Sequence, residues 1–286
     1  MRPPPPLGPS FFARWTSRIA LFSLGILAVA MLLHRLLSLP TQVAFNLAAV
    51  AFAGAAVSIG LAIAAAVGIW RTGRPGTSRI VFGMVVSLGL LLWPLIFLPS
   101  YERLPKINDV TTDAADPPAF VTLARLRGPG TNSPDYPGAA FARSQAAAYP
   151  DIKPIVINRP VDEAFELAAD AIRRLKMEIV RQEPPDPETR RPGMLEAVDR
   201  TLILGFYDDV AIRVAGNDEQ ARIDVRSASR FGRHDLGSNA DRVRQILKEI
   251  VVRMESVVPA TRAKAEPKDV KEEQPRSRRS RRRRRR

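Results

Sequence analysis

Three long apolar runs set the first hundred residues apart from the rest of the chain. They cover residues 19–39, 43–70 and 80–98, and each is long enough to cross about 30 Å of hydrocarbon. The triplet 28–30 resembles a signal-peptide cleavage site, but it lies inside the first run, so we favour an uncleaved span. The pattern predicts three N-terminal transmembrane helices.

Beyond residue 160 the apolar residues follow the spacings of surface helices and strands. Residues 161–175 carry apolar side chains every three or four positions, which predicts a helix that begins at Pro160. A similar stripe over 243–258 predicts a closing helix that starts near Ser238, whose hydroxyl can cap it.

Between these helices the spacing becomes that of strands. Four strand-like runs cover residues 177–181, 194–199, 206–215 and 221–227. In the last two, apolar and charged residues alternate, which predicts one buried and one polar face. The Gly216 to Asp218 turn joins these two runs into a hairpin. The fold class is therefore α+β: three transmembrane helices, then a two-layer domain with an antiparallel sheet covered by two helices.

Composition refines this division into five parts. They are a cytoplasmic N-terminus (1–18), three transmembrane helices (19–98), a linker (99–115), an α+β extracytoplasmic domain (116–258) and a disordered arginine-rich tail (259–286). The linker and the start of the domain are rich in Pro, Asp, Ala and Gly and show no sustained period.

The positive charge of the chain is concentrated at its two ends. The net charge is +14, and nine of the last eleven residues are arginine. Because the predicted domain is not itself basic, we do not expect it to bind nucleic acid. We expect the tail to attract an anionic lipid or an acidic envelope polymer if it lies outside the membrane, or nucleic acid if it lies in the cytoplasm, with an incidental solvated tail as a further alternative. The absence of cysteine excludes disulfides and thiolate metal sites.

Arginines also predict the orientation in the membrane. Only Arg35 lies in the first loop between spans, whereas six arginines flank the spans on the other side: Arg2, Arg14, Arg18, Arg71, Arg74 and Arg79. The positive-inside rule then places the N-terminus in the cytoplasm and the domain outside. Small residues four apart in the second span, Gly54, Ser58 and Ala62, predict close packing among the spans or a homo-oligomer.

Polar residues are unusually dense over 196–244, and we single out nine of them as a candidate polar network or anion site. They are Glu196, Asp199, Asp208, Asp209, Arg226, Ser229, Arg230, Asp235 and Asn239. A structural network of ion pairs is one interpretation. Anion binding through Arg226, Ser229 and Arg230 is a second. An enzyme that uses Glu196, Asp208 and Asp209 as acid, base or metal ligands is a third, although adjacent aspartates on one strand point to opposite faces.

Three segments carry a resemblance to a known family. EAVDR (196–200), GFYDDVAIRV (205–214) and DVRSASRFGRHDLGSNADRVRQI (224–246) resemble the core motifs of domain-of-unknown-function family fourteen-ninety-nine. The resemblance implies an uncharacterised bacterial envelope protein of the alphaproteobacterial, membrane-anchored type. It implies a bacterial inner membrane location with the soluble domain in the periplasm. It does not indicate any chemical activity.

The resulting functional expectation is a membrane-anchored envelope protein whose domain binds or scaffolds. The alternative is a carboxylate- or metal-dependent enzyme that acts at the polar face of the sheet. We expect no cofactor and no metal site, because glycine-rich phosphate loops, zinc helices and calcium loops are absent from the sequence.

Overall fold

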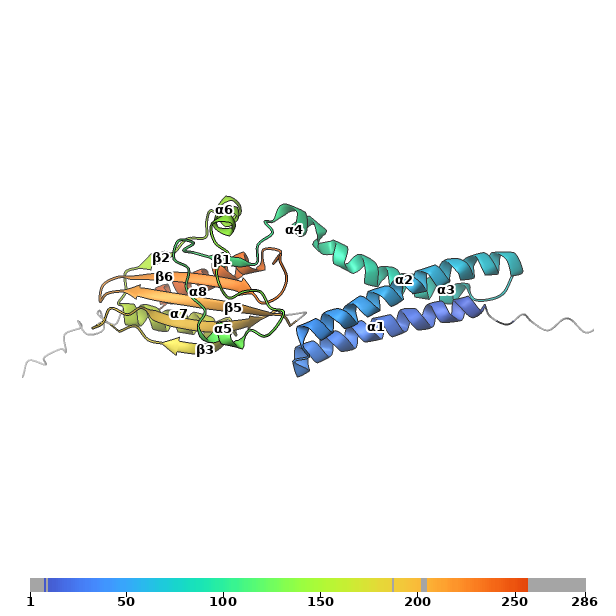
Figure 1. Ribbon diagram of the computed structural model, residues 1–286, viewed down its shortest axis with the longest axis horizontal. Coiled ribbons are helices and arrows are strands. Elements are labelled where there is room, and N and C mark those ends of the chain that lie inside the picture. Colours follow the sequence, from blue (N-terminus) through green and yellow to red (C-terminus); the bar gives the residue numbers. More distant parts are fainter. Residues whose placement is uncertain (1–7, 9, 187, 202–204, 257–286) are drawn as a thin grey trace, which may run out of the picture.

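The computed structural model describes residues 8, 10–186, 188–201 and 205–256. Figure 1 shows two parts along the long axis, a bundle of long helices and a domain built on a sheet. The predicted tail, 259–286, lies outside the described residues.

Three helices long and apolar enough to cross a membrane form the first part, which we call the anchor. They are α1 (Phe11–Leu37), α2 (Thr41–Thr72) and a third that comprises α3 (Thr77–Leu92), the 3₁₀ turn η1 (Trp93–Phe97) and α4 (Leu98–Arg103). This confirms the three predicted spans.

The small residues of α2 pack within the anchor. Ser58 donates a hydrogen bond of 3.0 Å to the carbonyl of Thr16 in α1, and a side chain at Gly54 would collide with Ser23. Packing among the spans therefore accounts for this stripe. A homo-oligomer stays a prediction.

The sheet of the domain is antiparallel throughout, with the order β1-β6-β5-β4-β3 and with β2 also pairing with β6. The strands are β1 (Asp109–Thr111), β2 (Ile155–Ile157), β3 (Glu178–Glu183), β4 (Gly193–Arg200), β5 (Tyr207–Gly216) and β6 (Ala221–Ser229). The four predicted runs correspond to β3 to β6, and the predicted hairpin joins β5 to β6. β1 lies within the stretch 99–115 that we expected to be a linker. The sequence did not predict this strand, because three residues are too few to show a period.

Helices α7 (Val161–Arg174) and α8 (Ser238–Ser256) cover one side of the sheet, which we call the helix face. Their apolar stripes meet Val210, Ile212 and Val225 in the main core. α8 starts at Ser238, as predicted, but its cap differs from the prediction. The Asp235 carboxylate accepts hydrogen bonds from the amides of Gly237 and Asn239 and so takes the capping role that we expected of the Ser238 hydroxyl.

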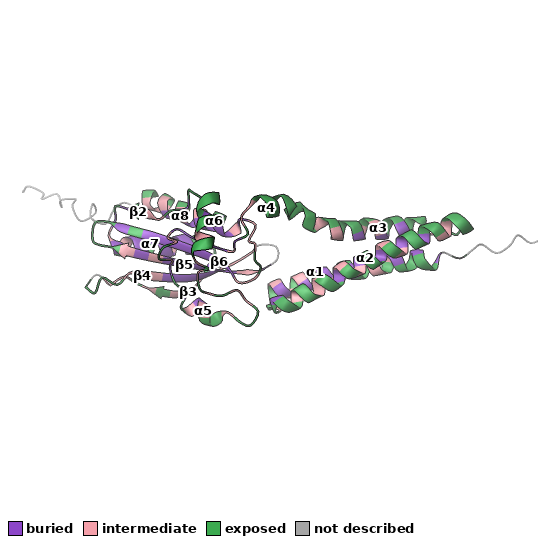
Figure 2. Ribbon diagram, turned by 45° about the horizontal axis from the view of Figure 1, so that its top comes forward, coloured by how far each residue is buried: buried purple, intermediate pink, exposed green. Residues whose placement is uncertain are grey.

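The opposite side of the sheet, the loop face, is covered by residues 113–138, which we call the covering segment. It contains the short helix α5 (Thr122–Leu126), and α6 (Ala139–Ala148) follows it. Phe120 and Leu123 of this segment pack on Val198, Ala211 and Ala228 of the sheet. Figure 2 shows that much of the central sheet is buried. The polar face predicted from strand alternation is therefore largely enclosed.

Candidate functional site

Strand alternation divides the six candidate residues that lie on strands between the two faces of the sheet. Asp199, Asp208 and Ser229 are neighbours across β4, β5 and β6 and share the helix face. Glu196, Asp209 and Arg226 lie on the loop face. Asp208 and Asp209 point to opposite faces, so the three proposed carboxylates of the enzyme interpretation do not converge on one site.

Glu196 holds the beginning of α5 against the loop face. Its carboxylate accepts hydrogen bonds from the amides of Val121, Thr122 and Leu123 at 2.8–3.1 Å, and Arg181 approaches it at 2.8 Å. The side chain is 0% exposed. Burial acts to raise the pKa of this carboxyl, but the three amides and Arg181 outweigh burial and lower the pKa below its ordinary value. Glu196 therefore stays ionised as a structural acceptor.

Arg226 joins β6, β1 and the covering segment. Its guanidinium forms a bidentate pair with Asp109 of β1, with N–O distances of 3.0 and 2.7 Å. It also donates to the carbonyls of Pro118 and Pro134, and it stacks over Phe120 at 4.4 Å from the ring centre. The planar fork of arginine suits this arrangement. Burial raises the pKa of Asp109, and the pairing with Arg226 opposes that rise.

Two arginines from different segments pair with Asp209. Arg127 of the covering segment lies 2.8 Å from one carboxylate oxygen, and Arg230 lies 2.7 Å from the other. Arg127 also donates to the carbonyls of Asn132 and Ser133. The covering segment is thus fixed to the sheet by Asp209, Glu196 and Arg226.

On the helix face the polar residues gather around Arg242 of α8. Its guanidinium lies 2.6 Å from Asp199 and 2.6 Å from Asp208, and it donates to Asn239 at 2.9 Å. Asn239 in turn donates to the Ser229 hydroxyl at 2.9 Å. Burial raises the pKa of Asp208, with Arg242 acting against that rise. The structure therefore does not gather Arg226, Ser229 and Arg230 around one anion.

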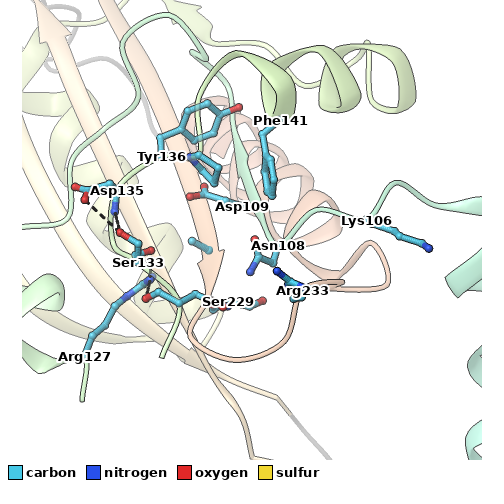
Figure 3. A pocket seen from close by; sticks show the side chains of 13 residues that line it. Lys106, Asn108, Asp109, Arg127, Ser133, Asp135, Tyr136, Phe141, Ser229 and Arg233 are labelled. Atoms are coloured by element: carbon cyan, nitrogen blue, oxygen red, sulfur yellow. Dashed lines mark hydrogen bonds between the residues drawn. The ribbon is translucent and has the colours of Figure 1, made fainter. Parts of the chain in front are cut away.

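A cavity of about 440 Å³ opens where the covering segment, α6 and the end of β6 meet. We call it the Tyr136 cavity, and Figure 3 shows its lining. The side chains that line it include Lys106, Asn108, Asp109, Arg127, Asn132, Ser133, Asp135, Tyr136, Phe141, Ser229 and Arg233. Of the nine candidates only Ser229 lines the cavity directly. Asp209 pairs with Arg127, and Arg226 pairs with Asp109, so these two candidates contact residues of the lining.

Two buried polar atoms in this lining have no hydrogen-bond partner in the described part of the chain: Nη2 of Arg127 and the hydroxyl of Tyr136. The Arg127 side chain is only 3% exposed. Burial and the nearby Asp109 raise the pKa of Tyr136 to about 12. Tyr136 therefore keeps its proton at neutral pH, so its hydroxyl and Nη2 of Arg127 can both donate hydrogen bonds.

The sheet, its cover and most residues that line this cavity fall within the part of the chain that matches a family model. Residues 109–250 match a family described as a protein of unknown function (DUF1499). The chain is a member of the DUF1499 family. No curated protein matches the chain.

Sequence reasoning missed several residues that build the DUF1499 domain's polar sites. Asp109, Arg127 and Tyr136 lie in a stretch without period, so no local signal connects them to the sheet. Arg242 could have been noticed, because it lies one helical turn before Ile246, in line with the apolar stripe of α8, where an apolar side chain is expected. The described residues contain no group of three or more His, Asp or Glu side chains placed to hold a metal ion.

Proposed function

We propose that the DUF1499 domain is a binding module that holds a small acidic ligand in the Tyr136 cavity. One observation carries this proposal: the unpartnered buried polar atoms of the cavity, on Arg127 and Tyr136, are donors. The carboxylates of the candidate network, in contrast, already accept hydrogen bonds from arginines or backbone amides. A ligand that supplies acceptor oxygens would satisfy the atoms that remain.

The charge at the rim of the cavity favours the same class of ligand. Arg233 and Lys106 line the cavity and are exposed, and neither forms an ion pair within the described residues. Asp109 is neutralised by its bidentate pair with Arg226. The exposed carboxylate of Asp135 also lines the cavity and offsets one of the two rim charges, so a smaller excess of positive charge remains, which suits a carboxylate or a phosphate.

The enzyme alternative has less support from the geometry. Glu196, Asp208 and Asp209 would have to act as acid, base or metal ligands, yet each is held in a separate arginine pair on one of two faces. A general acid or base must reach the proton that it transfers. Breaking any of these pairs would cost stability, so a binding role is the simpler function for this domain.

We place the domain in the periplasm of a bacterial cell, with the anchor in the inner membrane. Arg14, Arg18, Arg71 and Arg79 gather at one end of the three helices, where the amide of Ser10 also bonds the carbonyl of Pro75. That end would face the cytoplasm by the positive-inside rule. Reporter fusions after Arg74 and after Ser256 should be active on opposite sides of the membrane. Activity of both on one side would contradict this orientation.

The ligand proposal is tested by titrating the full chain in detergent with inorganic phosphate and with citrate, followed by calorimetry. At least one of the two should bind. Tyr136→Phe removes only the hydroxyl, and Arg233→Gln removes one rim charge; each should weaken binding by roughly tenfold. Arg125→Gln is the matched control, because Arg125 is exposed on α5 and does not line the cavity. Equal affinity in all four proteins, or no binding of either anion, would refute the proposal.

A further inference from the structure

The third helix of the anchor separates from the other two as it approaches the domain, and Figures 1 and 2 both show this divergence. The cause lies at Pro94. Proline has no amide hydrogen and cannot continue an α-helix, and here α3 gives way to the 3₁₀ turn η1. The regular helix resumes as α4 at Leu98, with Pro99 in its first turn, where proline is tolerated. The three helices are therefore closely packed at one end and open at the end near the domain.

An apolar cavity of about 280 Å³ occupies this opening, within the apolar length of the helices. Its walls include Leu27 and Met31 of α1, Ala48 and Phe52 of α2, and Trp93 and Phe97 of η1. An unfilled cavity of this kind forfeits the dispersion contacts of its lining. In a bilayer the neighbouring material is hydrocarbon, so a lipid chain is the natural occupant.

The domain closes the end of this cavity that faces it. Phe206, which precedes β5, lies 5.5 Å from the ring of His34 and 5.3 Å from that of Phe45, measured between ring centres. Phe206 therefore links the domain to the anchor at the level where an acyl chain would end and a headgroup would begin.

Two arginines meet at that same level and lack carboxylate partners within the described residues. Arg35 of α1 donates to the carbonyl of Thr201 at 2.7 Å, and Arg200 of β4 donates to the carbonyl of His34 at 2.7 Å. Both side chains line a larger cavity, of about 900 Å³, between the end of α1 and the domain. Arg226 and Arg242, by comparison, are paired with carboxylates. The carboxylates of Glu178, Asp199 and Asp241 also line this cavity, but none of them forms an ion pair with Arg35 or Arg200, so these two positive charges remain available to an anion.

His34 adds a second unpartnered group. It is 2% exposed, and its Nδ1 lies 2.6 Å from the carbonyl of Leu39, so Nδ1 must carry the hydrogen. Nε2 lines the apolar cavity and is buried without a partner. It can accept a hydrogen bond from a hydroxyl. A lipid with a polar group at this depth would satisfy it.

We propose that the junction of anchor and domain is a binding site for one anionic phospholipid. An acyl chain fills the apolar cavity beside Pro94, the glycerol region lies at His34, and the phosphate lies against Arg35 and Arg200. This site is separate from the Tyr136 cavity and does not depend on the ligand proposed there. It also does not involve the arginine tail.

The test uses the full chain in nanodiscs made of phosphatidylcholine with a minor fraction of phosphatidylglycerol. After release into detergent, native mass spectrometry counts the retained lipids. Phosphatidylglycerol should be enriched by roughly tenfold or more over its share of the disc, as expected for two arginines near the surface. Arg35→Gln combined with Arg200→Gln should abolish this enrichment, whereas Arg71→Gln combined with Arg79→Gln, at the opposite end of the helices, should preserve it.

The binding of the acyl chain in the apolar cavity is tested independently of charge. Ala44 lines the apolar cavity, and Ala44→Phe should fill it and displace the retained lipid. Ala49→Phe, on an exposed side of the same helix, is the matched control and should retain it. If Ala44→Phe fails to insert into the membrane, the proposal is still tested by the enrichment of phosphatidylglycerol over phosphatidylcholine on the unaltered chain. Retention of phosphatidylcholine in proportion to its abundance, or full retention by Ala44→Phe, would overturn the proposal.

Discussion

The two faces of the DUF1499 sheet are buried by different chemistry. On the helix face, Val210, Ile212 and Val225 pack against α7 and α8 through apolar contacts, and the polar residues around Arg242 are confined to one end of this core. On the loop face, Glu196 and Arg226 bind backbone groups of the covering segment through charged hydrogen bonds. Apolar contacts tolerate small shifts, whereas each charged bond requires a particular partner. The loop face should therefore respond much more sharply to the loss of single polar atoms.

The largest effect is expected at Arg226. Arg226→Ala would leave Asp109 buried without a partner and would free the carbonyls of Pro118 and Pro134. Breaking a buried pair in this way commonly costs about 3 to 5 kcal/mol, which approaches the total stability of a small domain. We expect the domain to unfold or nearly unfold, as measured by thermal and denaturant unfolding of the full chain.

A double variant sharpens the same comparison. Arg226→Met with Asp109→Leu replaces the pair by apolar groups and should recover part of the stability, because neither charge is then left alone. Recovery should be incomplete, since the two proline carbonyls remain unpaired. If Arg226→Ala were as stable as the unaltered chain, the stability of the loop face would not depend on this pair. The direct partner of Arg226 is Asp109, a residue that the sequence analysis did not single out.

A smaller effect is expected at Glu196, and it should depend on pH. The folded state lowers the pKa of this carboxyl. Its contribution is therefore present above the pKa of the unfolded chain, which is about 4.3 for glutamate, and is lost as the pH falls through the lower folded value. Glu196→Gln should cost about 1 to 3 kcal/mol at neutral pH, because an amide cannot accept from three backbone N–H groups as well as from Arg181.

Melting temperatures between pH 7 and pH 3 provide the measurement for Glu196. The unaltered chain and Glu196→Gln should converge toward the acidic end, because protonation removes the same interaction that the substitution removes. Glu183→Gln is a suitable control, since Glu183 also pairs with Arg181 but is 46% exposed. A constant difference between the two chains at every pH would mean that the charge of Glu196 is not what holds α5.

The same comparison explains which parts of the molecule could be predicted from the sequence. The helix face depends on apolar residues at regular spacing, so α7, α8 and the β5–β6 hairpin were predicted with nearly correct bounds. The covering segment depends on backbone amides and carbonyls that any sequence carries. Because Glu196 and Arg226 bind its backbone, the sequence of the covering segment shows no regular spacing of apolar residues. Asp109 and Arg127 were missed for that reason. The junction could not be predicted either, because Arg35 and Phe206 are far apart in the sequence.

The smallest effect is expected at Arg222, four residues before Arg226 on the same strand and face. Its guanidinium lies 2.7 Å from Asp113 and 3.0 Å from Asp224, but its side chain is 47% exposed, so solvent screens both pairs. Asp224 also keeps a second partner, Arg213, at 3.2 Å. Arg222→Ala should therefore cost less than about 1 kcal/mol, and this cost should shrink further as salt is raised. Since Arg222 and Arg226 differ mainly in burial, a large loss of stability for Arg222→Ala would show that the number of ion pairs, and not their enclosure by the covering segment, stabilises the loop face.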